Sequence, residues 1–449
     1  MTQASTAASP ASRREIWAWS MYDWANSAYT TLSITVLVNY INKVVVGPKT
    51  EIARDMARWA SALGIQGEPD RAGPVVWSWG ISLAVLAAAL VSPVAGAMAD
   101  ARASKRRWLA TTALLGAAGA TLLGVVPPDA PWAIIALFLW VTFFFELAFG
   151  FYNGFLPELA TVENMDRISA KGFAYGYVGG GLALALEFVI FHFGEGWGLD
   201  RVAQLRIGLL IMGLWWAIFS LPAVFILRDR AAPRSDPLPF FRAAAGAVSD
   251  VRRTLGNIRA YRMLALFLLG FLFFNDAIQT VIIEAGLFAE RDLHFQQAEL
   301  LLLILAFQFV CLPGAMLVGW VIDKLGQKRT LMAYLGIWIA LLIAAYFIQT
   351  KLQFWCLSVF LGLVMGGTQS VSRSIMALMT PKERTAEFFG FFNFSGRATS
   401  WIGTLLFGAV IGATGEARLA ILSLLALFII GTAFTAFVNV AQGQREARA

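Results

Sequence analysis

The sequence predicts an all-α integral membrane protein with twelve transmembrane helices arranged as two pseudo-symmetric bundles of six. Of its 449 residues, 58% are hydrophobic and only 14% are charged, and the mean hydropathy is +0.67. This composition leaves too little polar surface for a soluble particle of this size. Twelve apolar runs are long enough for an α-helix to cross a bilayer, which takes about 20 residues. A short basic turn also occurs twice, once in each half of the chain.

This turn has the pattern Gly-x-x-x-Asp with an arginine six residues after the aspartate, at residues 96–107 and 319–329. A second repeat points to the same duplication. Residues 22–27 and 275–280 place a carboxylate, an amide and a hydroxyl at the same spacing. Because six crossings separate the copies, both basic turns fall on one side of the membrane, as expected for parallel repeats.

The first six apolar runs predict the first bundle, residues 1–227. We expect helices over residues 16–41, 74–100, 108–126, 131–159, 172–193 and 205–227. Pro127 and Pro128 end the third helix, and a turn with Arg167 and Lys171 precedes the fifth. Residues 52–63 have apolar side chains at helical spacing with arginines between them, which is typical of a short helix on the membrane surface.

Residues 228–262 change to an Arg-, Pro- and Asp-rich composition, with Pro233, Pro237 and Pro239 close together. This change predicts a cytosolic linker, whose later part, residues 240–258, is expected to form an interfacial helix. The second bundle then occupies residues 263–449. We expect its helices over residues 263–289, 298–323, 330–348, 354–379, 388–412 and 419–440.

The basic residues lie mainly on alternate loops, which predicts the orientation of the chain. With the amino terminus in the cytoplasm, both basic turns, the linker and the carboxyl terminus are cytosolic. The net charge of +7 is then explained by topology, and no nucleic-acid partner is expected. The first run contains Asp23, Asn26 and Asn39, so it does not resemble a cleavable signal peptide.

Residue types that usually bind metals or carry out catalysis, such as cysteine and histidine, are not grouped in this sequence. Cys311 and Cys356 lie in separate predicted helices without a second thiol or a histidine at metal-ligand spacing. His192 and His294 lie in different halves. We therefore expect no disulfide framework, no metal, no cofactor and no enzymatic activity.

The repeated turns resemble the loop signature of the major facilitator superfamily, which lies between helices 2 and 3 and again between helices 8 and 9. Residues 22–28, 151–153, 366–374 and 387–391 are similar to the vacuolar-effluxer-like branch, the autophagy-related amino-acid effluxers. The resemblance covers the whole twelve-helix plan. It implies alternating access and export of small solutes such as amino acids. Many proton-driven drug exporters of the superfamily have an arginine in helix 4, and its absence from residues 131–159 disfavours multidrug antiport.

Polar side chains inside the predicted helices are candidates for function, because an ionised group at mid-membrane costs roughly 2.5–3.5 kcal/mol. The proton-coupling candidates are Asp23, Glu146 and Asp276. The substrate-binding candidates offer amide, phenol or guanidinium groups. They are Asn26, Tyr152, Asn153, Asn275, Gln279, Gln369, Arg373 and Asn393.

Structural roles are the alternative for these residues. Amides in membrane helices often form interhelical hydrogen bonds, and Asp23 and Asp276 could each be paired with Arg373 or Arg397. Glu187 and His192 lie near the outer end of the fifth helix and are candidates for a proton relay. The alternative for His192 is a position at the membrane interface.

The candidates for a cytosolic gate come from the repeated turns and from helix 11. They are Asp100, Arg107, Asp323, Arg329 and Arg397. Asp100 and Asp323 each end a helix, where the helix dipole disfavours a negative charge. Each is therefore expected to have a partner, either the amino terminus of a neighbouring helix or an arginine.

The sequence as a whole predicts a secondary transporter that moves a small polar or zwitterionic, amino-acid-like solute by alternating access. We expect proton-coupled export by a monomer in the bacterial inner membrane. One alternative is an amphiphilic cargo such as a lysolipid or peptide. Another is a receptor that keeps the fold without transporting.

Overall fold

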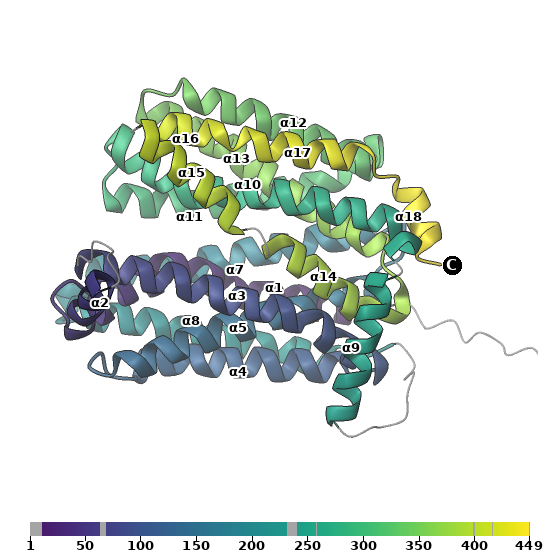
Figure 1. Ribbon diagram of the computed structural model, residues 1–449, viewed down its shortest axis with the longest axis horizontal. Helices are drawn as coiled ribbons and strands as arrows, with labels where there is room; N and C mark the ends of the chain where they lie inside the picture. The colour runs from purple at the N-terminus through teal and green to yellow at the C-terminus, as the bar shows by residue number, and fades with distance from the viewer. Residues whose placement is uncertain are drawn as a thin grey trace, which may run out of the picture.

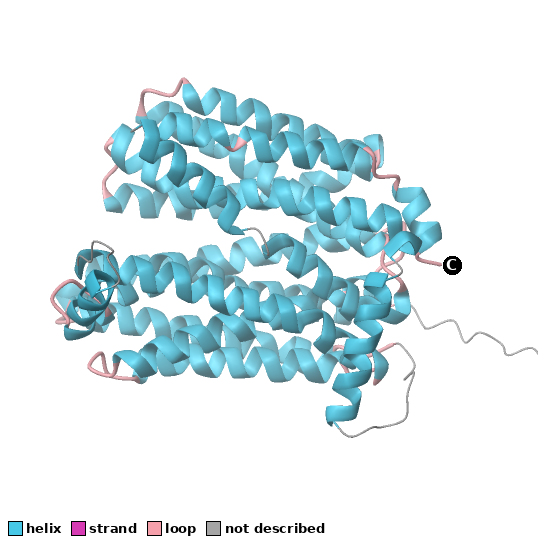
Figure 2. Cartoon of the chain, viewed as in Figure 1, coloured by secondary structure: helices cyan, strands magenta, loops and turns pink. Residues whose placement is uncertain are grey.

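The fold comes from a computed structural model, which describes residues 11–62, 69–230, 240–256, 258–397, 400–414 and 416–448. The helices lie in two layers, each built mainly from one half of the chain, and the helix at residues 385–397 of the second half lies beside the helix at residues 69–101 of the first (Figure 1). Short loops connect them at both ends (Figure 2). We call the end with the turns at residues 102–104 and at Gly326 the basic end, and the other the opposite end.

The first layer is built from the first half of the chain. Its long helices are α1 (Arg13–Leu32), α3 (Pro69–Ala101), α4 (Lys105–Val125), α5 (Pro131–Gly154), α7 (Met165–Phe193) and α8 (Arg201–Ile226). Shorter elements connect or extend them. These are the π-helical segments η1 (Ser33–Leu37) and η2 (Tyr40–Val45), α2 (Glu51–Ala62), α6 (Leu156–Leu159) and the 3₁₀ turn η3 (Gly194–Trp197).

The second layer begins after α9 (Phe240–Gly256) and the 3₁₀ turn η4 (Ile258–Tyr261). The helices of the second half are α10 (Arg262–Leu293), α11 (Gln297–Leu325), α12 (Gln327–Tyr346), α13 (Lys351–Leu378), α14 (Thr385–Arg397), α15 (Ser400–Thr414), α16 (Ala417–Ser423), α17 (Leu425–Ala436) and α18 (Val440–Glu446). Of these, α14 lies against α3 and α5 of the first layer. The short turn η5 (Lys382–Arg384) precedes α14.

Ten described helices are long and apolar enough to cross a bilayer. Helix α1, the first predicted crossing, is not among the ten because it is more polar than they are. The eleventh predicted crossing is described as α14 and α15, and the twelfth comprises α16 and α17. The all-helical prediction is therefore confirmed for the part of the chain that the structure describes.

Several predicted boundaries are wrong. Helix α7 begins at Met165, so Arg167 and Lys171 lie within a helix and not in a turn before it. Helix α3 begins at Pro69, five residues before the predicted start at Pro74. In both cases the apolar run marks only the stretch inside the bilayer, whereas the helical hydrogen bonds continue into the polar region beyond it.

The first predicted helix, residues 16–41, is not a uniform α-helix. It changes to π-helical segments at Ser33–Leu37 and Tyr40–Val45. Polar side chains bond back to the main chain there: the Thr35 hydroxyl donates to the Thr31 carbonyl at 2.9 Å, and the Asn39 amide donates to the Thr35 carbonyl at 2.6 Å. Such bonds compete with the helical ladder and loosen it.

Helices form in both polar connections where the pattern predicts them. The surface helix of residues 52–63 is α2, with Ile52 buried and Trp59 exposed; residue 63 lies outside the described residues. The interfacial helix of the linker is α9, which packs on α3 through Ala247. The linker prolines at 233, 237 and 239 also lie outside the described residues.

The two halves of the chain approach each other closely where α3 meets α14. A Cβ atom added at Gly96 would overlap the carbonyl oxygen of Ala386, and one at Gly390 would lie 2.7 Å from the Cα atom of Pro93. Glycine at both positions allows the two helices to pack this closely. Helix α14 also contacts α5, whereas α15 packs on α10 and α16 of its own layer. The first and second halves of the chain are therefore packed together along α14.

A side chain at Gly96 should force this end of the protein open. We expect Gly96→Val to separate α14 from α3, because overpacking a close contact costs ~1–3 kcal/mol. The measurement is the distance between spin labels at Arg107→Cys and Arg329→Cys, exposed positions at the basic end of the two layers, with the exposed Cys356 changed to serine.

The control is Gly336→Val, because a Cβ atom at Gly336 would meet nothing within 4 Å. The expected result is a longer label distance for Gly96→Val alone. An unchanged distance for Gly96→Val would show that the α3–α14 contact does not hold the basic end together.

Candidate functional site

One deeply buried charge connects the two halves of the chain. Arg373 of α13 is 1% exposed, and its guanidinium reaches into the first layer. Its Nη1 donates to Asp23 Oδ2 at 3.3 Å and to Asn153 Oδ1 at 3.2 Å. Its Nη2 donates to the Ser169 carbonyl at 2.6 Å, and its Nε donates to the Ser169 hydroxyl at 3.2 Å. One side chain thus binds three helices of the other layer, α1, α5 and α7.

Aromatic side chains surround this ion pair. The Tyr152 hydroxyl donates to Asp23 Oδ2 at 2.9 Å, and the Tyr152 ring stacks on Trp19 with centroids 4.7 Å apart. The Arg373 guanidinium lies 3.8 Å from the centre of the Phe173 ring and 5.0 Å from that of Trp19. Rings of this kind attract a cation while excluding water. We call Asp23, Tyr152, Asn153, Ser169 and Arg373 the Arg373 cluster.

A second buried group of charges joins the layers at the basic end. Lys105 Nζ lies 2.6 Å from Glu158 Oε1 and 3.7 Å from Asp100 Oδ1, and it also bonds the Thr385 hydroxyl at the start of α14. Asp100 Oδ2 accepts a hydrogen bond from the Glu387 N–H at 3.0 Å. Because Glu387 lies in the first turn of α14, the partner of Asp100 is the amino terminus of a neighbouring helix together with a lysine.

Two more contacts cross between the layers close to the basic end. Asp166 of α7 bonds the Ser374 hydroxyl of α13 and accepts a hydrogen bond from the Gln327 amide at 2.9 Å. Arg167 and Asp323 form an exposed ion pair at 3.0 Å. The basic end is therefore closed by several polar contacts in addition to the Arg373 cluster.

The predicted gate arginines are not the residues that pair with the gate aspartates. Arg107 and Arg329 are exposed, and the described partners are Lys105 for Asp100 and Arg167 for Asp323. The reason is geometric. Lys105, at the start of the helix that follows the turn, faces Asp100, and Arg167 of a different helix faces Asp323. The side chain of Arg397 lies outside the described residues.

Several predicted amides form a chain between helices. The Gln369 amide of α13 donates to Asn275 Oδ1 of α10 at 3.2 Å, and Asn275 Nδ2 donates to the Gly396 carbonyl of α14 at 2.9 Å. Asn393 of α14 donates to the Glu146 carbonyl of α5 at 3.1 Å, and Glu146 is itself buried. These contacts connect α14 to α5 in the first layer and to α10 in the second.

Two other predicted amides lie on the first helices of the two halves. Asn26 is buried on α1, and its Nδ2 has no hydrogen-bond partner among the described residues. Gln279 on α10 is half-buried, one turn beyond Asn275. Neither belongs to the Arg373 cluster.

Asp276 lies next to these amides on α10 and is 1% exposed. Its Oδ2 accepts a hydrogen bond from the N–H of Gly403, in the first turn of α15, at 2.9 Å. Within the described ranges its Oδ1 has no hydrogen-bond partner. A buried carboxylate oxygen without a donor is costly to keep ionised.

Sequence reasoning identified Asp23, Tyr152, Asn153 and Arg373, and the structure brings all four together. It missed Ser169, Lys105, Asp166 and Arg167. Serine in a membrane helix gives no signal by itself, and Lys105 is one of three adjacent basic residues that the sequence does not distinguish. Among the described residues, no three His, Cys, Asp or Glu side chains are grouped as a metal site would need.

Comparison with known proteins identifies the family. A sequence profile described as "Vacuole effluxer Atg22 like" matches residues 11–448. The chain belongs to the Atg22-like effluxer family. It is 28% identical over 423 residues to the uncharacterized MFS-type transporter YxiO of Bacillus subtilis strain 168, with 94% of each chain covered.

More distant members of the Atg22-like family include fungal proteins. The chain is 26% identical over 320 residues to autophagy-related protein 22 of Kluyveromyces lactis. That match covers 67% of this chain and 63% of the fungal protein, so the chain spans less than two thirds of that relative's length.

Solved structures confirm the major facilitator fold of this Atg22-like protein. The human organic anion transporter MFSD10 superposes with a TM-score of 0.71 at 14% identity, covering 94% of this chain and 99% of that one. The proton:xylose symporter XylE superposes with a TM-score of 0.69 at 14% identity, covering 95% of each chain. At these identities the likeness shows the fold alone, and the family match supports a membrane transporter.

The Asp100 contact predicts how α14 should respond to mutation. Asp100→Ala removes the acceptor of the Glu387 N–H, and losing a buried hydrogen bond to a charged group costs ~1–3 kcal/mol. We therefore expect amide hydrogen exchange in the first turn of α14 to become about tenfold faster, measured by mass spectrometry on peptides that contain Glu387.

Asp323→Ala is the matched control, because Asp323 ends the equivalent helix in the second layer and its ion pair with Arg167 is exposed. Exchange at Glu387 should stay as in the wild type in this variant. Equal exchange in the wild type and in Asp100→Ala would mean that Asp100 does not hold α14.

Proposed function

We propose that this protein is a secondary active transporter that exports a small polar or zwitterionic, amino-acid-like solute by alternating access, coupled to protons. The observation that carries the proposal is the Arg373 cluster. It joins the two bundles through one buried ion pair near the basic end. A contact of this kind holds one end closed and can break as a unit, as alternating access requires.

The contacts between the layers support a state that is closed at the basic end. The Arg373 cluster, the Lys105 contacts and the Asp166 contacts all lie toward this end. Helix α15, farther from this end, packs mainly on α10 and α16 of its own layer. The positive-inside rule places the basic end in the cytoplasm. The state described is therefore proposed to be cytosol-closed, with both termini in the cytoplasm.

The polar groups of α10 and α13 support a small polar solute. Asn275, Gln279 and Gln369 offer amide donors and acceptors on the first helix of the second half and on the helix beside it. The hydrogen bonds that Asn275 makes with Gln369 and with the Gly396 carbonyl are neutral, so a solute can replace them at little cost. Asp276 is one residue from Asn275 and can pair with an ammonium group or take up a proton.

Asp276 is the proposed coupling residue. Asp276 has one carboxylate oxygen without a partner among the described residues, whereas the carboxylate of Asp23 is paired with Arg373. Asp23 is satisfied by Arg373 and Tyr152, so its role is proposed to be in closing the cytosolic end. Glu146, which was also predicted to carry protons, lies beside the α5–α14 contact.

Export is supported by the family, whose profile describes vacuole effluxers. A relative that matches 94% of this chain is a Bacillus protein, which supports the cell membrane of a bacterium as the location. The fold contains the complete interbundle contact within one chain, which supports a monomer as the working unit.

A liposome assay of Asp276→Asn tests the proposal. Purified protein is reconstituted with an imposed pH gradient and offered a mixture of amino acids, peptides and lysolipids, and uptake is read by mass spectrometry. We expect pH-driven accumulation of an amino-acid-like solute by the wild type. Asp276→Asn should lose accumulation while keeping exchange of the same solute without a gradient, because the amide cannot release a proton.

Glu290→Gln is the control, since Glu290 lies on the same helix but is exposed. It should transport as the wild type does. Undiminished pH-driven accumulation by Asp276→Asn would contradict the coupling role, and movement of the lysolipid alone would contradict the solute class.

A further inference from the structure

A buried carboxylate without a hydrogen-bond partner among the described residues lies in the first layer, far from Asp276 in the chain. Glu187 is on α7, six residues before the helix ends at Phe193. Its side chain is 1% exposed, and neither carboxylate oxygen has a hydrogen-bond partner among the described residues. The proposed transport mechanism gives Glu187 no role.

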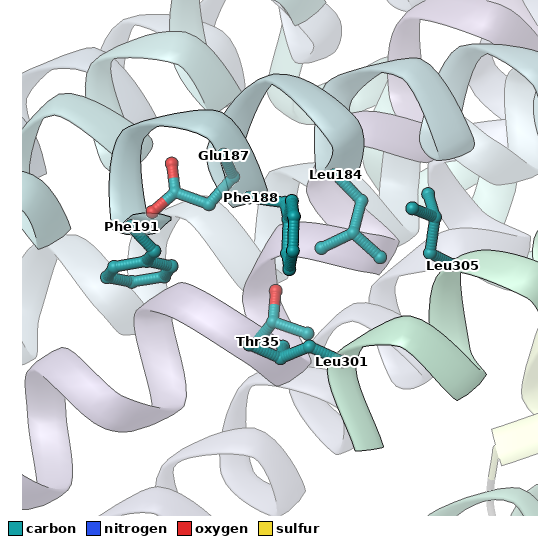
Figure 3. A pocket seen from close by; sticks show the side chains of 7 residues that line it. All are labelled: Thr35, Leu184, Glu187, Phe188, Phe191, Leu301 and Leu305. Atoms are coloured by element: carbon teal, nitrogen blue, oxygen red, sulfur yellow. The ribbon is translucent and has the colours of Figure 1, made fainter. Parts of the chain in front are cut away.

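Glu187 borders a small cavity at the seam between the two layers (Figure 3). The other residues around the cavity are apolar except for one threonine. They are Leu184, Phe188 and Phe191 of α7, Thr35 of η1, and Leu301 and Leu305 of α11. The Thr35 hydroxyl already donates to the Thr31 carbonyl at 2.9 Å. The surroundings therefore give an ionised carboxylate little stabilisation.

The seam itself is tightly packed. Helices α7 and α11 are in contact along their length, and a Cβ atom at Gly181 would lie 3.1 Å from the Phe309 ring. The Gln308 amide of α11 donates to the Thr31 hydroxyl of α1 at 2.7 Å. Glu187 thus lies where the two bundles must separate if the opposite end is to open on this side.

Helix α8 packs closely against the carboxyl group of Glu187. A Cβ atom at Gly208 of α8 would overlap the carboxyl oxygen Oε2 of Glu187. Glycine at this position allows the carboxyl group to fit between α7 and α8. The position is therefore built to hold an acid side chain and keep it away from water.

Within the described residues no charged group nearby forms a hydrogen bond or an ion pair with Glu187, and Arg201 acts on it only through its charge. Arg201 at the start of α8 lies 4.1 Å over the Phe191 ring and donates to Gln204 Oε1 at 3.1 Å. His192 is exposed and stacks on Phe188. On α11, Glu299 pairs with Lys351 at 2.6 Å. Arg206 of α8 donates to the Gly124 carbonyl at 3.0 Å.

We propose that Glu187 is a second proton-binding site, which holds a proton while α7 and α11 are packed together and releases it when they separate. An unpaired carboxylate is costly in an apolar site, whereas a protonated carboxyl group is neutral and tolerates burial. Separation of the helices would admit water, which stabilises the ionised form. Proton binding therefore favours the packed seam.

This inference rests on the proposed function for the source of the protons and adds a second proton to that of Asp276. The two acids lie in different bundles, so each bundle carries its own proton. Helix α7 also carries Ser169 of the Arg373 cluster, 18 residues from Glu187, or about 27 Å along the helix axis. One helix thus connects the contact near the basic end to the proposed proton site near the opposite end.

The test measures the α7–α11 seam directly as a function of pH. Spin labels are placed at Phe193→Cys and Leu302→Cys, which are 52% and 50% exposed, in the Cys356→Ser background in lipid nanodiscs. In the otherwise wild-type protein we expect the label distance to lengthen between pH 5 and pH 9. In Glu187→Gln, which mimics the neutral acid, the distance should stay short at both pH values.

Glu195→Gln is the control, because Glu195 is an exposed acid at the same end, in η3. It should respond to pH as the wild type does. Glu187→Leu provides a second neutral variant if Glu187→Gln does not fold, and its seam should also be insensitive to pH. A pH response of normal size in either neutral variant, or no response in the wild type, would overturn the proposal. Because no solute is needed, failure of the flux assay would refute the proposed function without altering this result.

Discussion

A guanidinium cannot remain buried in a membrane protein without partners, and the arrangement of the two bundles follows from how Arg373 meets this requirement. Its side chain leaves α13 and finds its partners on α1, α5 and α7. Removing one partner of such a pair typically costs ~3–5 kcal/mol, because a buried charge is left uncompensated. The pair therefore fixes the relative position of the two bundles near the basic end more firmly than apolar packing, which has little driving force in lipid.

Close packing of α14 acts at the same end. Gly96 and Gly390 allow the backbones of α3 and α14 to approach, and this places the first turn of α14 within reach of Asp100. The helix dipole then favours the negative charge that it would disfavour at the end of α3. Small residues and buried charges thus reinforce one another, and both must be released together for the basic end to open.

The sequence was sufficient to predict the helical fold, the duplicated halves and the family resemblance, because hydropathy and turn motifs are local features. It also offered Arg373 as a partner of Asp23, since both are charges inside predicted helices that need compensation. It did not predict Lys105 or Arg167 as partners of the aspartates. Those contacts depend on which face of one helix meets another, and helical spacing within one segment does not contain that information. For the same reason the serine and threonine side chains that complete the contacts were missed.

The central claim is that the Asp23–Arg373 pair holds the basic end closed, and a double-mutant cycle tests it most directly. The fraction of closed molecules is measured by the distance between labels at positions 107 and 329 in Asp23→Asn, Arg373→Gln and the double variant. We expect each single substitution to lower the fraction of closed molecules. In the double variant this fraction should fall by much less than the sum of the two single effects. Strictly additive effects, or closed fractions equal to that of the unsubstituted protein, would contradict the claim.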